Sequence, residues 1–68
     1  MIKLEDVKID NVRKEMRVSL FADTKTEVVN DPEFDERIPG YKIAMGSDVL
    51  TATGDIAFMR SDGVWSWL

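Results

Sequence analysis

The chain has 68 residues, which make a single domain, and a core of this size contributes only about 3–5 kcal/mol to stability. Cysteine and histidine are both absent, which excludes disulfides, the usual zinc and haem ligands, a cysteine nucleophile and a histidine general base. The net charge of −4 argues against general nucleic-acid binding, which needs a basic surface to neutralise phosphates.

The first 22 residues predict an N-terminal β-hairpin. Residues 2–9 alternate loosely between apolar and polar side chains, and the phase slips at Glu5-Asp6, which indicates a bulge or a short break. Asp10-Asn11 is a turn signal. Residues 16–22 then alternate cleanly, so we expect a half-buried strand with one apolar stripe, formed by Met16, Val18, Leu20 and Ala22.

The segment 24–29 fits one short helical turn. Thr24 and Glu27 have the spacing of a capping box, in which each side chain bonds the other residue's backbone. The β-branched residues Thr26, Val28 and Val29 disfavour a helix, so a turn followed by a short extended piece fits equally well.

An acidic loop follows at 30–40, and it contains both prolines and one glycine. The carboxylates of its 31–36 stretch suit a solvated surface loop. A calcium site is the alternative, because Asp31, Glu33 and Asp35 alternate along the chain, but the glycine and distal glutamate of an EF-hand loop are missing.

Residues 41–68 predict a β-meander. Tyr41 to Met45 alternates with Tyr41, Ile43 and Met45 on one side, and Gly46-Ser47 ends that run. The following strands begin near Val49, Asp55 and Val64. Thr53-Gly54 has the form of a two-residue hairpin loop, and Ser61-Asp62-Gly63 fits a three-residue loop.

These loops predict a register in which both faces of the final hairpin are apolar. With Ser61-Asp62-Gly63 as the loop, Met59 lies opposite Trp65, and Ile56 lies opposite Leu68. The two-residue loop places Leu50 with the tryptophans and Val49 on the other face. One face then carries Ala57, Met59, Trp65 and Trp67, and the other carries Ile56, Phe58, Val64 and Leu68.

We therefore expect a mostly β fold: a small antiparallel sheet or sandwich of about five short strands with a C-terminal β-meander. The N-terminal hairpin would stack on one apolar face through its stripe, and a partner protein would cover the other. The expected interface residues are Phe58, Met59, Trp65, Trp67 and Leu68.

Two other roles for the tryptophans stay open. In the first, Trp65 and Trp67 belong to the chain's own core, with the 30–40 loop folded over them. In the second, they form a stacking platform for a carbohydrate or a nucleobase, although no basic groove accompanies them.

Several short motifs resemble small proteins encoded among the head and tail genes of tailed phages and prophages of Gram-positive bacteria. They are Leu20-Phe21-Ala22-Asp23-Thr24-Lys25, Ile43-Ala44-Met45-Gly46-Ser47, Thr53-Gly54-Asp55-Ile56-Ala57 and Ser61-Asp62-Gly63-Val64-Trp65. The resemblance covers about two-thirds of the chain and implies a virion structural protein, such as a capsid decoration or minor head protein. It supplies no catalytic residues.

From these observations we expect a non-enzymatic virion component, assembled in the host bacterial cytoplasm, that contacts itself or the major capsid protein. We expect no cofactor, no nucleic-acid partner and no membrane segment, since no run approaches the roughly 20 apolar residues of a span. The alternatives are a phage-encoded inhibitor or regulator of a host protein, and a carbohydrate-binding module that uses Trp65 and Trp67.

Overall fold

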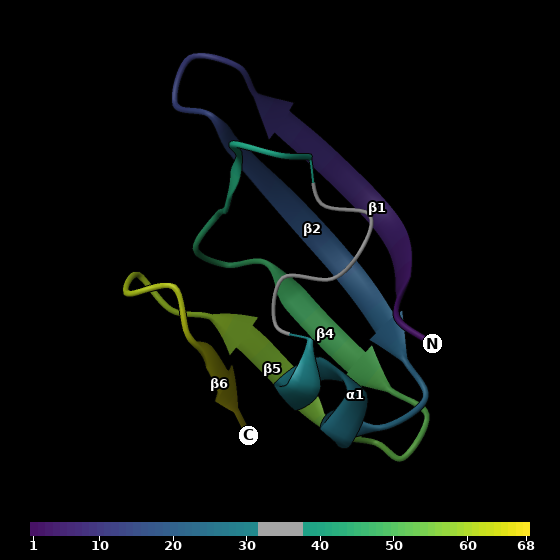
Figure 1. Ribbon diagram of the computed structural model, residues 1–68. Helices are drawn as coiled ribbons and strands as arrows, with labels where there is room; N and C mark the ends of the chain where they lie inside the picture. The colour runs from purple at the N-terminus through teal and green to yellow at the C-terminus, as the bar shows by residue number, and fades with distance from the viewer. Residues whose placement is uncertain (32–37) are drawn as a thin grey trace.

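The computed structural model describes residues 1–31 and 38–68 and confirms the mostly β fold. Six strands in these ranges form one mixed sheet, with β1, β2, β4, β5 and β6 side by side in that order (Figure 1). Their bounds are β1 Lys3–Asp10, β2 Glu15–Ala22, β3 Lys42–Ile43, β4 Asp48–Thr51, β5 Ile56–Met59 and β6 Trp65–Trp67. A single helix is described, α1 at Lys25–Asn30.

The N-terminal hairpin forms as predicted. Strands β1 and β2 pair antiparallel, and the register shifts between Leu4 and Asp6, where the alternation slips in the sequence. In the turn, the Asp10 carboxylate accepts hydrogen bonds from the backbone N–H groups of Val12 and Arg13, both at 3.0 Å. Asp10 therefore starts the turn through its own side chain.

The capping box is present, and it decides the 24–29 segment in favour of a helix. Thr24 accepts a hydrogen bond from the Glu27 backbone N–H, and the Glu27 carboxylate accepts one from the Thr24 N–H. Glu27 also accepts from the Met1 ammonium, which holds the pKa of this carboxyl below its ordinary value, helped by the Thr24 and Asp23 backbone N–H groups. Val28 is buried against the sheet and anchors the helix.

The N-terminal hairpin lies beside the C-terminal meander, which corrects the expectation that it would stack on top. Strands β2 and β4 are parallel neighbours, with Leu20 opposite Val49 and Ala22 opposite Thr51. The segment that carries α1 is long enough for the crossover that parallel strands need. Pairing also satisfies backbone groups of β2 that a stacked hairpin would leave open along an edge.

The run from Tyr41 to Met45 is only partly a strand. β3 has two residues and pairs parallel with the start of β2. Met45 is 66% exposed in the turn that follows, so it does not share a buried side with Tyr41 and Ile43 as predicted. Gly46 ends the run with a φ of +90°, a conformation that few other residues adopt.

The register of the last hairpin is the predicted one, but the register before it is not. Met59 lies opposite Trp65, and the Leu68 N–H donates to the Ile56 carbonyl at 2.9 Å. Between β4 and β5, however, Thr51 closes on Asp55 with residues 52–54 as a three-residue loop. That single extra residue moves Leu50 and Val49 each to the opposite face from the predicted one.

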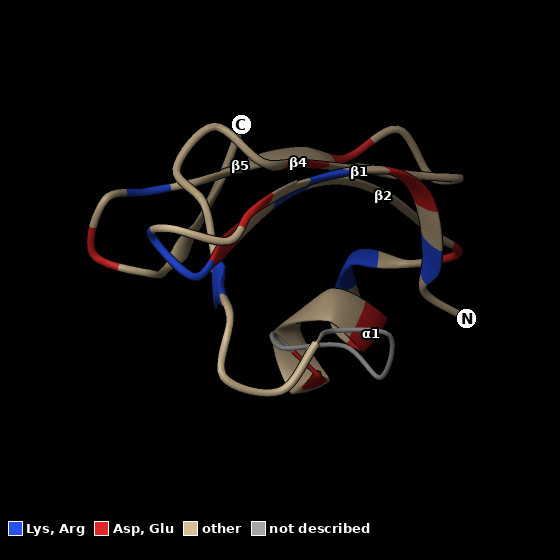
Figure 2. Cartoon of the chain, turned by 90° about the horizontal axis from the view of Figure 1, so that it is seen from above, with Lys and Arg blue, Asp and Glu red and all other residues tan. Residues whose placement is uncertain are grey.

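The core lies on the concave face of the curved sheet, under α1 (Figure 2). The predicted apolar stripe of β2 is buried there, and side chains of α1, β4, β5 and β6 complete it. The buried apolar residues are Met16, Val18, Leu20, Ala22, Val28, Val49, Ala57, Met59 and Trp65. One helix and one sheet thus give the two layers that a core needs.

Candidate interaction surface

The convex face of the sheet carries an apolar patch that no described segment covers. Figure 2 shows α1 on the concave side only, with the opposite side of the sheet open. We call this surface the convex patch, and it consists of Phe21, Leu50, Ile56, Phe58 and Leu68.

Strand pairing brings the convex patch together from four separate parts of the chain. Phe21 lies opposite Leu50 across β2 and β4, and Leu50 lies opposite Ile56 across β4 and β5. Residues opposite each other in a sheet share a face, so these side chains form one row that Leu68 extends beyond β6. Phe58 follows Ile56 on the same face, two residues along β5.

The side chains of the convex patch are considerably exposed for their size. Leu50 is 46% exposed, Phe58 45%, Ile56 37% and Leu68 84%, whereas Phe21 is half-buried. Isolated exposed apolar residues are ordinary, whereas a contiguous patch is a candidate contact surface.

The structure divides the five predicted interface residues between the two faces. Phe58 and Leu68 lie in the convex patch, where a partner can reach them. Met59 and Trp65 are only 5% and 8% exposed on the concave face, so both belong to the chain's own core.

Trp67 lies with Trp65 on the concave face and is half-buried. The Lys25 ammonium, at the start of α1, lies 5.1 Å from the centroid of the Trp67 ring. Because Trp65 is buried and Lys25 stands over Trp67, the chain does not present two adjacent open indoles. The stacking platform therefore lacks its geometric basis.

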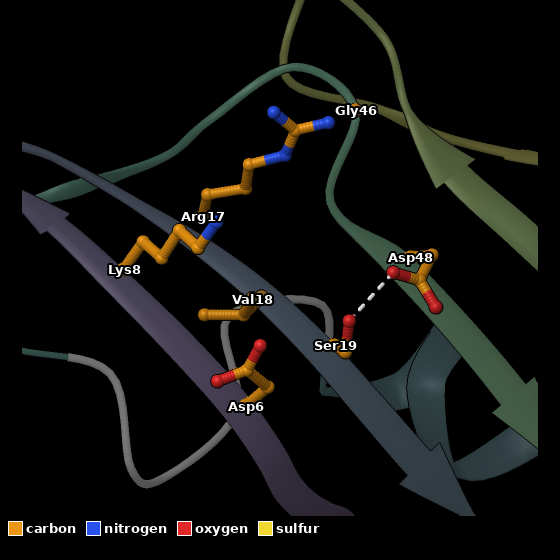
Figure 3. A pocket seen from close by; sticks show the side chains of 7 residues that line it. All are labelled: Asp6, Lys8, Arg17, Val18, Ser19, Gly46 and Asp48. Atoms are coloured by element: carbon orange, nitrogen blue, oxygen red, sulfur yellow. Dashed lines mark hydrogen bonds between the residues drawn. The ribbon is translucent and has the colours of Figure 1, made fainter.

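Beside the convex patch lies a shallow polar hollow of about 200 Å³ on the same face (Figure 3). Lys8 and Arg17 line it opposite Asp6 and Asp48, and the Ser19 hydroxyl donates a 2.8 Å hydrogen bond to Asp48. A lone carboxylate is a weak base toward an alcohol, so this contact ties β2 to β4 and does not by itself activate a nucleophile.

Ser47 holds a structural position that its sequence context did not reveal. Its side chain is fully buried, and its hydroxyl accepts a 3.0 Å hydrogen bond from the Val18 N–H. The Ser47 carbonyl also accepts from the Met59 N–H at 2.8 Å. Ser47 thus joins β2 to β5 just before β4 begins, although Gly46-Ser47 alone reads only as a turn.

The described residues contain no cluster of three acidic side chains that could hold a metal ion. Most of the acidic 31–36 stretch, including Glu33 and Asp35 of the calcium alternative, lies outside the described ranges. Within those ranges no helix has the length and apolar character to cross a membrane.

Comparison with known proteins identifies no relative: no family model, no curated protein and no solved structure matches the chain.

Proposed function

We propose that this protein is a non-enzymatic structural component of a tailed-phage particle that acts through protein–protein contacts of the convex patch. The observation that carries the contact role is the apolar row that runs from the half-buried Phe21 of β2 through the exposed Leu50 of β4 to the exposed Ile56 of β5. The virion assignment rests on the motif resemblance. The motifs contain Gly46, Gly54 and Gly63, and each of these glycines has a positive φ, as their turns require.

A particle with many copies suits a domain of this kind. Each protomer offers a modest apolar contact, and a symmetric shell repeats that contact many times. Multivalency then converts weak single contacts into stable association without any larger surface on the domain. Charged side chains beside the patch, such as Arg17 and Asp48, would set the orientation of the contact.

Quantitative mass spectrometry of purified particles tests this proposal. The gene would be replaced in the phage or prophage by variants that encode Leu50→Lys or, as the control, Val12→Lys. Val12 is 93% exposed in the β1–β2 turn, far from the convex patch. We expect the wild-type chain and the control in particles at a constant ratio to the major capsid protein, and Leu50→Lys reduced at least about tenfold.

Absence of the wild-type chain from particles, despite its presence in the lysate, would overturn the virion role. Co-purification with a single host enzyme in that case would favour an inhibitor or regulator. Equal incorporation of Leu50→Lys and wild type would show that the convex patch is not the contact surface.

A further inference from the structure

We infer that the convex patch is covered by a second copy of this chain, giving a two-fold dimer in which two sheets stack face to face. The inference rests on the proposed function and names the first occupant of its contact surface. Each protomer would contribute one sheet with its helix outside, so that the dimer has four layers: helix, sheet, sheet, helix. In such an interface the same patch meets itself.

The area of the convex patch matches what a dimer of this size needs. From the exposed fractions of Leu50, Ile56, Phe58 and Leu68, the open surface of these four residues is roughly 400 Å². A standard interface buries about 800 Å² per partner, of which a little over half is apolar. The patch therefore supplies most of the apolar part of one side, and its polar surroundings supply the rim.

The shape of the surface favours a sheet as the occupant. The patch lies on adjacent strands joined by regular backbone pairing, from Phe21 through Leu50 to Ile56, and forms a broad face. The hollow at Arg17 is polar, and a second hollow, at Phe21, is rimmed by the charged residues Lys3, Glu5 and Asp23. A second sheet face, with side chains standing out at the same spacing, fits such a surface by interdigitation.

The charges next to the patch permit self-association despite the net charge of −4. Lys8 and Arg17 stand with Asp6 and Asp48, two cations with two anions, so that identical faces bring together no excess of one sign. Within the described residues neither cation forms an ion pair, which leaves both free to meet carboxylates of a second copy.

Sedimentation equilibrium of the purified chain tests the dimer from about 1 µM to about 1 mM, a range that covers weak and moderate affinities. We expect the mass to rise from one chain to two, and Leu50→Lys to raise the dissociation constant at least about 30-fold, because a lysine would be buried among apolar side chains. Val12→Lys should change it by less than about twofold. Near-UV circular dichroism would verify that each variant is folded.

Dilution followed by ¹H–¹⁵N NMR gives a second readout that needs no variant. Shifts that change with concentration should centre on Phe21, Leu50, Ile56 and Phe58 and spare Val28 on the concave side. A chain that is monomeric throughout, a dimer that Leu50→Lys leaves unchanged, or shifts centred on α1 would each overturn the inference.

These results are separable from the particle test. A chain that is monomeric in solution but retained in particles would keep the proposed function and assign the patch to another virion protein. A dimer that is absent from particles would keep the dimer and remove the virion role.

Discussion

At the residue scale, one buried hydroxyl joins strands that are remote in sequence. Ser47 is fully buried, accepts from the Val18 N–H and lies just before β4. Replacing a buried acceptor leaves its donor without a partner, which costs more than the net value of an average hydrogen bond. The Ser19–Asp48 hydrogen bond, which lines the nearby hollow, is only half-buried, so that water can replace a lost partner there at a lower cost.

Ser47→Ala should therefore lower the free energy of unfolding by about 1–3 kcal/mol, since the Val18 N–H loses its acceptor in a site closed to water. Urea unfolding followed by tryptophan fluorescence measures this change. Ser61→Ala, in an exposed loop, is the matched control and should shift stability by less than about 0.5 kcal/mol. Equal effects of the two substitutions would contradict the role of Ser47.

At the element scale, local side-chain chemistry specified the turns and the start of the helix. The length of the β4–β5 loop decided on which face of the sheet each side chain of β4 lies. The capping box at Thr24 and Glu27 outweighs the β-branched residues that follow, because it satisfies backbone N–H groups that a helix of six residues would otherwise leave open. In the β4–β5 loop, the Thr51 hydroxyl accepts from the Asp55 N–H at 2.9 Å and helps to close three residues instead of two.

Thr24→Ala should cost about 1 kcal/mol of stability, because the helix loses its N-cap and Val28 loses part of its anchorage. Thr26→Ala, on the exposed side of the same helix, should be neutral or slightly stabilising, since alanine is the better helix former. Thermal unfolding by far-UV circular dichroism compares the two. A larger loss from Thr26→Ala would refute the capping role.

At the scale of the whole molecule, a single sheet has one face inside the domain and one outside. The concave face holds the core under α1, including Met59 and Trp65. The convex face keeps Leu50, Ile56 and Phe58 substantially exposed. Of the five residues expected at an interface, Phe58 and Leu68 lie on this convex face. Met59 and Trp65, which were also expected there, lie in the core on the concave face, because the layer that covers them could not be known from the strands alone.

The two faces of the final hairpin should respond differently to truncation. Trp65→Ala removes a large core side chain and should cost about 3–5 kcal/mol, enough to unfold a domain of this size. Phe58→Ala should cost about 1–2 kcal/mol, because its ring is 45% exposed in the monomer. Chemical denaturation at low protein concentration separates these effects from association. A folded Trp65→Ala variant of near wild-type stability would refute the assignment of Trp65 to the core.

The sequence by itself determined the features that depend on near neighbours. Alternation and turn chemistry were enough for the β1–β2 hairpin with its bulge, for the β2 stripe and for the register of β5 against β6. Only the tertiary structure decided that β2 pairs with β4, that α1 covers one face, and that Leu50 lies on the other. Those features depend on pairing between remote segments and on a one-residue difference in loop length. Local preference does not encode such pairing, and a shift of one residue reverses the face on which every side chain of a strand lies.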